Sequence, residues 1–301
     1  MKNHLVLYLL DGILLLAGLG IFIGYLYNRN ISLQNGEPFN GDIAYTDVQY
    51  QVLLGPRIPE SAAHETVVAW MQSNLAKYGW SVEIQRTVSE GHPIENVIAK
   101  RGSGTPWIIL GAHYDSRLWS DQDPNPELRQ TPVPGANDGA SGVAVLLELA
   151  RTLPRNLGYQ TWLVFFDAED NGDIPEWNWL LGSQVFVSSL TSHPDKVVVV
   201  DMIGDSSLNI FKERNSNPDI TNSIWAQAAS LGYSSSFIDQ YKYSMLDDHT
   251  PFLNAGIPAV DIIDFDYPYW HTTQDTSDKV SPNSLLIVGK TLWTWLAAQR
   301  K

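Results

Sequence analysis

Hydrophobic residues recur along the chain in two alternating patterns, short apolar runs and apolar positions at helical spacing. The short runs are typical of buried strands and cover 107–110, 161–166, 197–200 and 259–263. Residues 80–88 alternate between polar and apolar positions, as in a half-buried strand, and 95–100 match them as a partner strand. Helical spacing predicts helices over 61–77, 139–153 and 284–299. Strands that alternate with helices predict an α/β sandwich with a largely parallel sheet.

The amino terminus has a different pattern, because residues 5–27 are almost continuously apolar and carry one charge, Asp11. This stretch is long enough to cross a bilayer as a helix. It is longer than the apolar part of a signal peptide, and no small-residue cleavage site follows it. We therefore expect a retained membrane anchor over residues 1–29, a tether over 30–45 and one domain over 46–301, on the non-cytoplasmic side.

Composition narrows the chemistry of that domain. The net charge of -14 argues against nucleic acid or anionic lipid as the main partner. The chain has 0 Cys, which excludes thiolate zinc ligands, a cysteine nucleophile and disulfides. Any metal in this protein must therefore be held by histidine, aspartate and glutamate.

Side chains that favour metal ions stand at the ends of the apolar runs. In open α/β sheets, ligands bind beyond the carboxyl ends of the strands, so such ends can converge on one crevice. Two histidines and several carboxylates at one crevice are suited to bind zinc. The set therefore predicts an enzyme. The segments are GAHYDS (111–116), PGANDG (134–139), FFDAED (165–170), VDMIG (200–204) and YWHT (269–272).

Asp138, Asp170 and His271 are our candidates for the three protein ligands that a catalytic zinc usually has. Each has a structural alternative. Asp138 precedes a predicted helix and can cap it, Asp170 is suited to a turn, and a single histidine is more often a hydrogen-bonded structural residue. Together, and in this order, the three favour a metal site.

His113 and Asp201 have two interpretations. They can form a second metal site with Asp138 as the bridging ligand. Alternatively, they bind no metal and orient the ligands through hydrogen bonds. Asp115 follows His113 closely, and it either orients that histidine or belongs to a turn at the strand end.

Glu169 is the best candidate for a general acid/base, because it adjoins the proposed ligand Asp170 and residues next to each other at a strand end point in different directions. A carboxyl group near zinc and shielded from water can have its pKa tuned toward the working pH. The alternative is a solvated loop glutamate.

Asp247 and Asp248 begin a predicted short helix, where the positive end of the helix dipole explains one of the two carboxylates. The other is expected to hold the substrate or a proton. Trp270 is expected to form an apolar wall over the metal, although a tryptophan packs in the core by default. Trp177 and Trp179, from one loop, are expected to line the rim of a pocket or to pack that loop onto the core.

Taken together, these segments resemble the zinc aminopeptidase family that also contains the animal-type glutaminyl-peptide cyclotransferases. The resemblance covers nearly all of residues 50–300 and begins with GPRIP at 55–59. It implies a three-layer αβα sandwich around a mixed, mostly parallel sheet. It also implies roles for the candidate residues: zinc ligands at Asp138, Asp170 and His271, the acid/base at Glu169, and active-site carboxylates at Asp201 and Asp248.

The chain resembles both branches of this family. Residues 270–272, 247–249 and 201–204 are similar to the cyclase branch, whereas 137–142 are closer to the peptidases. Two positions depart from the family pattern. Asp170 stands where both branches usually have glutamate, so its loop must lie closer to the metal, and Asp261 stands where animal cyclases carry a histidine.

Three functions follow as expectations. The first is cyclisation of N-terminal glutamine on peptides or proteins, with one zinc. The second is zinc aminopeptidase activity with one or two zinc ions, which His113, Asp138 and Asp201 favour. The third, which the complete set of ligands makes less favoured, is an inactive ectodomain that binds a partner.

Overall fold

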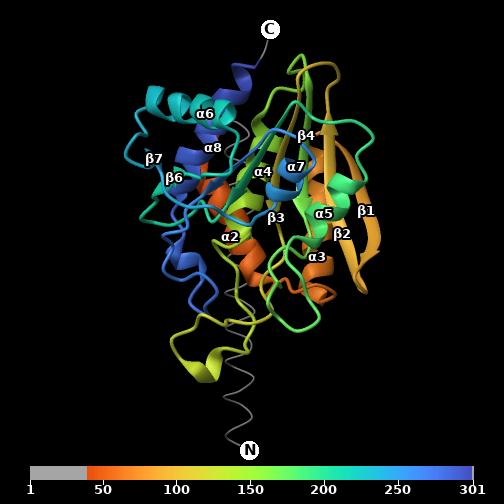
Figure 1. The fold of residues 1–301 in the computed structure, drawn as a ribbon, viewed down its shortest axis with the longest axis vertical. Helices are drawn as coiled ribbons and strands as arrows, with labels where there is room; N and C mark the ends of the chain where they lie inside the picture. The colour runs from red at the N-terminus through yellow and green to blue at the C-terminus, as the bar shows by residue number, and fades with distance from the viewer. Residues whose placement is uncertain (1–38, 300–301) are drawn as a thin grey trace, which may run out of the picture.

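The computed structural model describes residues 39–299, in which a six-stranded sheet lies between helices, with a small two-stranded ribbon to one side (Figure 1). The strands of the sheet follow the order β1-β2-β4-β3-β5-β8. Pairs β1–β2 and β2–β4 are antiparallel, whereas β4–β3, β3–β5 and β5–β8 are parallel. The mixed, mostly parallel sheet that we expect is therefore confirmed. Its strands are β1 (Ser81–Ser89), β2 (His92–Arg101), β3 (Trp107–His113), β4 (Gln160–Phe166), β5 (Lys196–Asp201) and β8 (Ala259–Ile263).

The remaining elements are helices and the ribbon. The α-helices are α2 (Gly41–Leu53), α3 (Ala62–Lys77), α4 (Ala140–Thr152), α5 (Leu181–Ser188), α6 (Pro218–Ser230), α7 (Thr250–Asn254) and α8 (Pro282–Ala297). The short 3₁₀ helices are η1 (Pro126–Leu128) and η2 (Ser277–Lys279), and the ribbon pairs β6 (Ile210–Lys212) with β7 (Phe237–Tyr241).

Side chains of the central strands alternate between two hydrophobic clusters, one on each face of the sheet. On β3, Leu110 belongs to the cluster that includes α4 and α8, whereas Ile109 belongs to the cluster that includes α5 and α7. On β5, Val198 and Val199 divide in the same way. Because successive residues of a strand point to opposite faces, continuous apolar runs are what a sheet covered on both faces requires.

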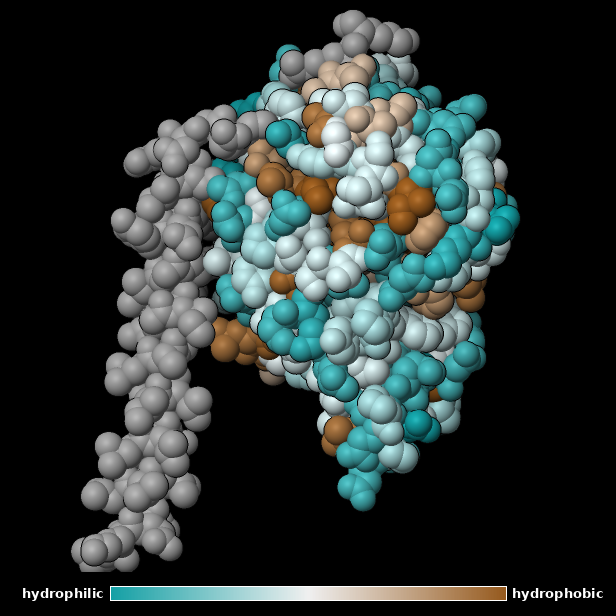
Figure 2. Space-filling view, turned by 90° about the vertical axis from the view of Figure 1, so that its left-hand side faces the viewer, coloured by the Kyte–Doolittle hydropathy of each residue, from teal (hydrophilic) through white to brown (hydrophobic). Residues whose placement is uncertain are grey.

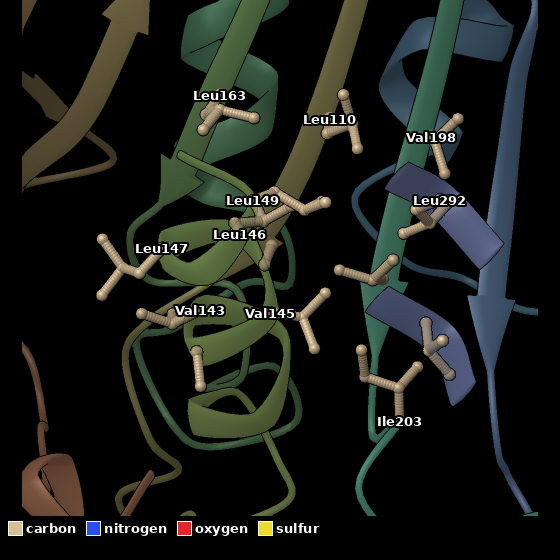
Figure 3. Close-up of a cluster of buried hydrophobic side chains, with 14 of the residues drawn as sticks. Leu110, Val143, Val145, Leu146, Leu147, Leu149, Leu163, Val198, Ile203 and Leu292 are labelled. Carbon is tan, nitrogen blue, oxygen red and sulfur yellow. The ribbon is translucent and has the colours of Figure 1, made fainter. Parts of the chain in front are cut away.

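The larger cluster is centred on α4, whose leucines and valines pack under β3, β4 and β5 (Figure 3). Gly142 permits this close approach, since a Cβ atom there would lie 2.5 Å from the carbonyl oxygen of Val200 and 2.9 Å from the Cβ of Ala112. The first turn of α4 thus lies against the ends of two strands. This packing brings the preceding residue Asp138 to the same edge of the sheet.

Strand β3 extends further than its apolar run indicates. Ala112 and His113 pair with Phe165 and Phe166 of β4, so the strand includes the start of the first motif. Strand β4 supplies the backbone hydrogen-bond partners, so His113 continues the parallel pairing opposite Phe166. His113 is consequently held by the sheet rather than by a loop.

Helix α2 occupies residues that overlap the tether expected over 30–45. It is weakly amphipathic and buries polar side chains, among them Asp47 and Gln51, so apolar spacing did not reveal it. The side chain of Gln51 donates a hydrogen bond to the carbonyl oxygen of Ala140, at the start of α4. The anchor expected over 1–29 lies outside the described residues. Within 39–299, none of the helices combines the length and the apolar character that crossing a bilayer requires.

The face shown in Figure 2 is mainly hydrophilic, and hydrophobic residues form small groups between polar ones.

Candidate active site

The candidate site lies at the carboxyl ends of β3, β4, β5 and β8, as expected for an open α/β sheet. Several residues at these ends have left-handed backbones, with φ of 50° at Ala168, 46° at Met202 and 54° at His271. Left-handed conformations are costly for residues other than glycine and often occur at functional sites. Here they turn the chain sharply next to Glu169 and Asp201, so that both side chains face the same crevice.

Asp138, Asp170 and His271 converge, and one donor atom from each lies within 4.8 Å of the others. The Nε2 of His271 lies 2.9 Å from Asp170 Oδ1 and 3.7 Å from Asp138 Oδ2. Asp138 does not cap α4, whose first turn has no side-chain cap. The Oδ2 atoms of Asp138 and Asp170 are buried and have no hydrogen-bond partner. Buried carboxylate oxygens without a partner are costly unless a cation binds them.

This donor set fits a zinc ion. It offers two carboxylates and one imidazole, which is a combination that catalytic zinc sites use when they keep a position open for substrate. The three side chains are almost fully buried, yet all three line a cavity. A substrate in that cavity can therefore reach a cation held by the three residues.

His113 lies beside this trio and contacts two of the carboxylates. Its Nε2 is 3.1 Å from Asp138 Oδ1 and 3.1 Å from Asp201 Oδ1. These three residues form a second group of donor atoms within 4.8 Å of one another. Both interpretations of His113, as a ligand of a second metal and as a hydrogen-bonding residue that orients the carboxylates, fit this geometry.

Asp115 orients more of the site than the sequence indicates. Its Oδ1 lies 3.4 Å from His113 Nδ1, as we expect for a carboxylate that fixes that ring. The same side chain also accepts hydrogen bonds from the backbone N–H groups of Glu169 and Asp170, at 3.1 and 3.3 Å. One buried carboxylate thus positions the end of β3 relative to the loop after β4.

Asp275 plays a similar part for Asp138, although no motif in the sequence singles it out. It accepts hydrogen bonds from the backbone N–H groups of Asn137 and Asp138 at 2.9 and 3.2 Å, and from the hydroxyl of Tyr267 at 2.6 Å. Burial, and then the charge of the nearby Asp138, raise the pKa of Asp275 to about 7.

Glu169 lines the cavity and is 8% exposed, so it is not a solvated loop residue. Burial raises its pKa well above the usual value for a glutamate. Electrostatic attraction to His113 lowers the pKa of Glu169 in part, whereas repulsion from the neighbouring carboxylate of Asp170 raises it further. A carboxyl group with a raised pKa next to an open cavity can accept and return a proton near neutral pH.

The cavity has a volume of about 250 Å³ and one largely apolar wall. Trp270 is part of that wall and stacks on His271, with ring centroids 3.7 Å apart, as we expect of an aromatic cover over the ligands. The hydrophobic residues that line the cavity are Trp179, Met202, Met245, Leu246, Ile263, Phe265 and Trp270.

Trp177 does not line this cavity, which corrects our expectation for the pocket rim. It stacks on His92 at the start of β2, with ring centroids 3.6 Å apart, because the loop after β4 turns back toward the sheet. Trp179, which we expect at the same rim, does line the cavity and passes directly over Gly172, where a Cβ atom would lie 2.1 Å from the indole. Both tryptophans come from one short loop, so only tertiary contacts distinguish them.

Asp247 lines the cavity, whereas Asp248 is fully buried behind it. Asp261, the residue that replaces a histidine of animal cyclases, is also fully buried, and its Oδ2 lies 4.0 Å from His249 Nδ1. Burial, and then the charge of Asp247, raise the pKa of Asp248 and of Asp261 well above the usual value. Each of these two carboxyl groups therefore holds a proton more readily than an exposed aspartate does, and Asp247 is the one of the three aspartates that lines the cavity.

The sequence model of peptidase family M28 matches residues 96–296, which include every candidate ligand and Glu169. The chain belongs to peptidase family M28. Membership in this family confirms the resemblance to zinc aminopeptidases and glutaminyl-peptide cyclotransferases, and it makes the protein an enzyme of that kind.

Within the M28 family, named relatives and solved structures include both chemical branches. A glutaminyl-peptide cyclotransferase of Boiga irregularis is 27% identical over 250 residues, which cover 69% of this chain and 64% of the relative. The match thus spans just under two thirds of that relative's length. The crystal structure of Porphyromonas gingivalis glutaminyl cyclase is 35% identical, with a TM-score of 0.83, over 87% of this chain and 99% of that one.

A Zn-dependent exopeptidase of Parabacteroides distasonis is nearly as similar. It is 32% identical, with a TM-score of 0.82, over 87% of this chain and 99% of its own. The fold is therefore common to both branches, and fold alone does not distinguish the two reactions.

Proposed function

We propose that this chain is a zinc-dependent glutaminyl-peptide cyclotransferase, which converts the N-terminal glutamine of a peptide into pyroglutamate and releases ammonia. The observation that carries the proposal is the similarity to Porphyromonas gingivalis glutaminyl cyclase over 87% of this chain. The site supports it, because Glu169 lines the same cavity as Asp138, Asp170 and His271.

Asp138, Asp170 and His271 would hold one zinc ion, which supplies a Lewis acid for the γ-carbonyl of the N-terminal glutamine. Glu169 takes a proton from the α-amine as that nitrogen attacks the γ-carbon. The same carboxyl group returns the proton to the departing amide nitrogen. A ring C–N bond forms, the original C–N bond of the amide breaks, and ammonia leaves.

Other residues of the cavity bind and shield the substrate. Asp201 and Asp247 face the cavity and can accept hydrogen bonds from the α-amine, while the backbone N–H of the buried Asp248 donates to the carboxylate of Asp247 and orients it. The stacked pair of Trp270 and His271 limits access of water to the ligands. Exclusion of water suits cyclisation, because the attacking nitrogen comes from the substrate itself.

Aminopeptidase activity is the second candidate, and the geometry of His113 favours it. The donor atoms of His113, Asp138 and Asp201 lie within 4.8 Å of one another, as a second zinc site requires. In that reaction Glu169 would take a proton from the water that attacks the first peptide bond. One zinc per chain supports cyclisation, and two zincs support hydrolysis.

The third candidate, an inactive ectodomain that binds a partner, requires that Asp170 is too short to reach a metal. The separation of 2.9 Å between Asp170 Oδ1 and His271 Nε2 speaks against that requirement.

Product analysis distinguishes the three functions. The purified full chain, loaded with zinc, is incubated with two peptides that differ only in an N-terminal glutamine or leucine, and the products are analysed by mass spectrometry. Cyclisation predicts a pyroglutamyl peptide plus ammonia from the first peptide and no change in the second. Free amino acids from either peptide overturn the proposal in favour of hydrolysis. No product from either peptide favours the partner-binding ectodomain.

A further inference from the structure

The segment between β3 and α4, residues 117–133, includes η1 and projects from the body of the molecule at the bottom of Figure 1. Despite its length, it is held firmly against the end of the chain that carries His271. The backbone N–H of Gln122 donates to the carbonyl oxygen of His271 at 3.1 Å. Asp123 accepts hydrogen bonds from the backbone N–H and the hydroxyl of Thr273, at 3.0 and 2.6 Å.

Within this segment, Asp121 faces the ring of His271. Its Oδ1 lies 3.3 Å from Nδ1 of His271, whereas Nε2 on the other side of the ring lies 2.9 Å from Asp170 Oδ1 in the metal trio. The two nitrogens of the ring therefore have different neighbours. A metal-binding histidine usually donates its second N–H to a carboxylate, which fixes the tautomer and the orientation of the ring.

We propose that Asp121 is a positioning residue for the metal site: it accepts the Nδ1 proton of His271 and keeps Nε2 free to bind zinc. The inference rests on the zinc site of the proposed function. It concerns a residue outside the ligand set and outside the motifs that the sequence singles out. Asp121 does not line the cavity, so its effect on the reaction passes through His271.

Arg117 holds Asp121 in place and connects it to the loop after β4, which carries Asp170. Its Nε and NH2 groups donate to the two oxygens of Asp121, at 3.0 and 2.9 Å. Its NH1 donates to the backbone carbonyl of Asp170 at 2.6 Å. A guanidinium group that binds both oxygens of a carboxylate fixes its direction, and Arg117 is only 1% exposed. Asp121 is therefore a preorganised acceptor.

Aromatic rings on both sides of His271 restrict its plane but not its tautomer. Trp270 stacks on the ring with an interplanar angle of 26°, and Trp179 lies nearly parallel to it at 15°, with centroids 6.2 Å apart. Asp121 is the carboxylate on the Nδ1 side of the ring, whereas the carboxylates on the Nε2 side, Asp138 and Asp170, are the proposed metal ligands.

The test compares Asp121→Asn with a matched control, Glu127→Gln, in the full chain. Glu127 belongs to the same segment, is exposed and lies in η1, so its substitution removes the same charge away from His271. Zinc affinity is measured by competition with a chromophoric chelator. We expect about 10- to 100-fold weaker binding for Asp121→Asn and less than about twofold change for the control. At saturating zinc, kcat should fall while KM changes little.

A measurement on the unaltered protein does not depend on whether the variant folds. The ¹⁵N chemical shifts of His271 in the zinc-loaded chain should show a protonated Nδ1 and a metal-bound Nε2. The opposite assignment overturns the inference, as does zinc affinity of Asp121→Asn within twofold of wild type or an equal loss in Glu127→Gln. If wild type binds no zinc, this inference and the zinc site fall together. If zinc binds but no pyroglutamate forms, only the proposed reaction fails.

Discussion

The Oδ1 atom of Asp170 lies 2.9 Å from the Nε2 atom of His271, although the first residue follows β4 and the second follows β8. The side chain of Asp170 is one methylene shorter than that of the glutamate that both branches of the family usually have at this position. Its backbone is held close by Asp115, which accepts from its N–H, and by Arg117, which donates to its carbonyl oxygen. The loop thus compensates for the shorter side chain.

Asp170→Glu should therefore weaken zinc binding, by about tenfold, although it introduces the more usual residue. The extra methylene must be accommodated in a site where Asp170 is only 2% exposed, and it displaces the carboxylate from its position next to His271. Chelator competition measures the effect, with the exposed Asp42→Glu as the control. Tighter binding by the variant would show that the loop has not adapted to aspartate.

Glu169→Gln should reduce turnover by about 10²- to 10⁴-fold and leave zinc affinity close to that of wild type. The amide has nearly the same shape as the carboxyl group but does not take up the proton of the attacking nucleophile. Steady-state rates on the preferred peptide and metal analysis on the same sample measure the two effects. Substantial activity in this variant contradicts the role of Glu169 as acid/base.

Chelation of the metal should lower both activity and stability, and zinc should restore both. Removal of the cation leaves the partnerless oxygens of Asp138 and Asp170 buried beside each other. A ligand that binds only the folded state stabilises it by about 4 kcal/mol when its concentration is 1,000 times Kd. Differential scanning calorimetry with and without chelator measures this change. His271→Asn is the control, and its Tm should respond much less to zinc.

Leu146→Ala should destabilise the protein by about 2–5 kcal/mol, because Leu146 is fully buried in the cluster between α4 and the sheet (Figure 3). Leu53→Ala removes the same atoms from a side chain that is 54% exposed and should cost less than about 0.5 kcal/mol. Urea unfolding of both variants gives the comparison. Equal losses of unfolding free energy in Leu146→Ala and Leu53→Ala would mean that the cluster around α4 is not the main core.

Asp264 should make the protein less stable as pH rises from about 4 to 7. Burial raises its pKa to about 7, even though the backbone N–H groups of Asn209 and Asp266 donate to it. The pKa of an aspartate in an unfolded chain is about 3.9, so in this interval the folded state holds the proton more tightly. The stabilisation is complete below pH 4 and is lost as pH rises through 7.

Comparison with Asp264→Asn isolates this contribution. Over that interval the unfolding free energy of wild type should fall more steeply with pH than that of the variant. The difference in slope should be at most about 1.4 kcal/mol per pH unit. Urea unfolding at several pH values, with zinc concentration held constant, provides the slopes. Identical slopes for wild type and variant would mean that Asp264 is ionised throughout.

Local patterns in the sequence were enough to locate most of the sheet and to predict which candidate ligands lie close together. Strands β3, β4, β5 and β8 contain the apolar runs, because a strand covered on both faces needs apolar side chains at successive positions. The convergence of Asp138, Asp170 and His271 was also predictable, since the carboxyl ends of such strands meet at one edge. Helix α2 was not, because its pattern is weak and it buries the polar residues Asp47 and Gln51, and the hydrogen bond from Gln51 to the carbonyl oxygen of Ala140 forms only in the folded core.

Tertiary structure decided the strand order, the choice between two nearby tryptophans and the residues that orient the ligands. Trp177 and Trp179 have the same chemistry and lie in one loop, yet only Trp179 lines the cavity. Asp121 and Asp275 lie in polar segments where an aspartate is ordinary. Their roles arise from hydrogen bonds with residues distant in sequence, whereas apolar periodicity and the residue types at strand ends are properties of short segments that a sequence displays directly.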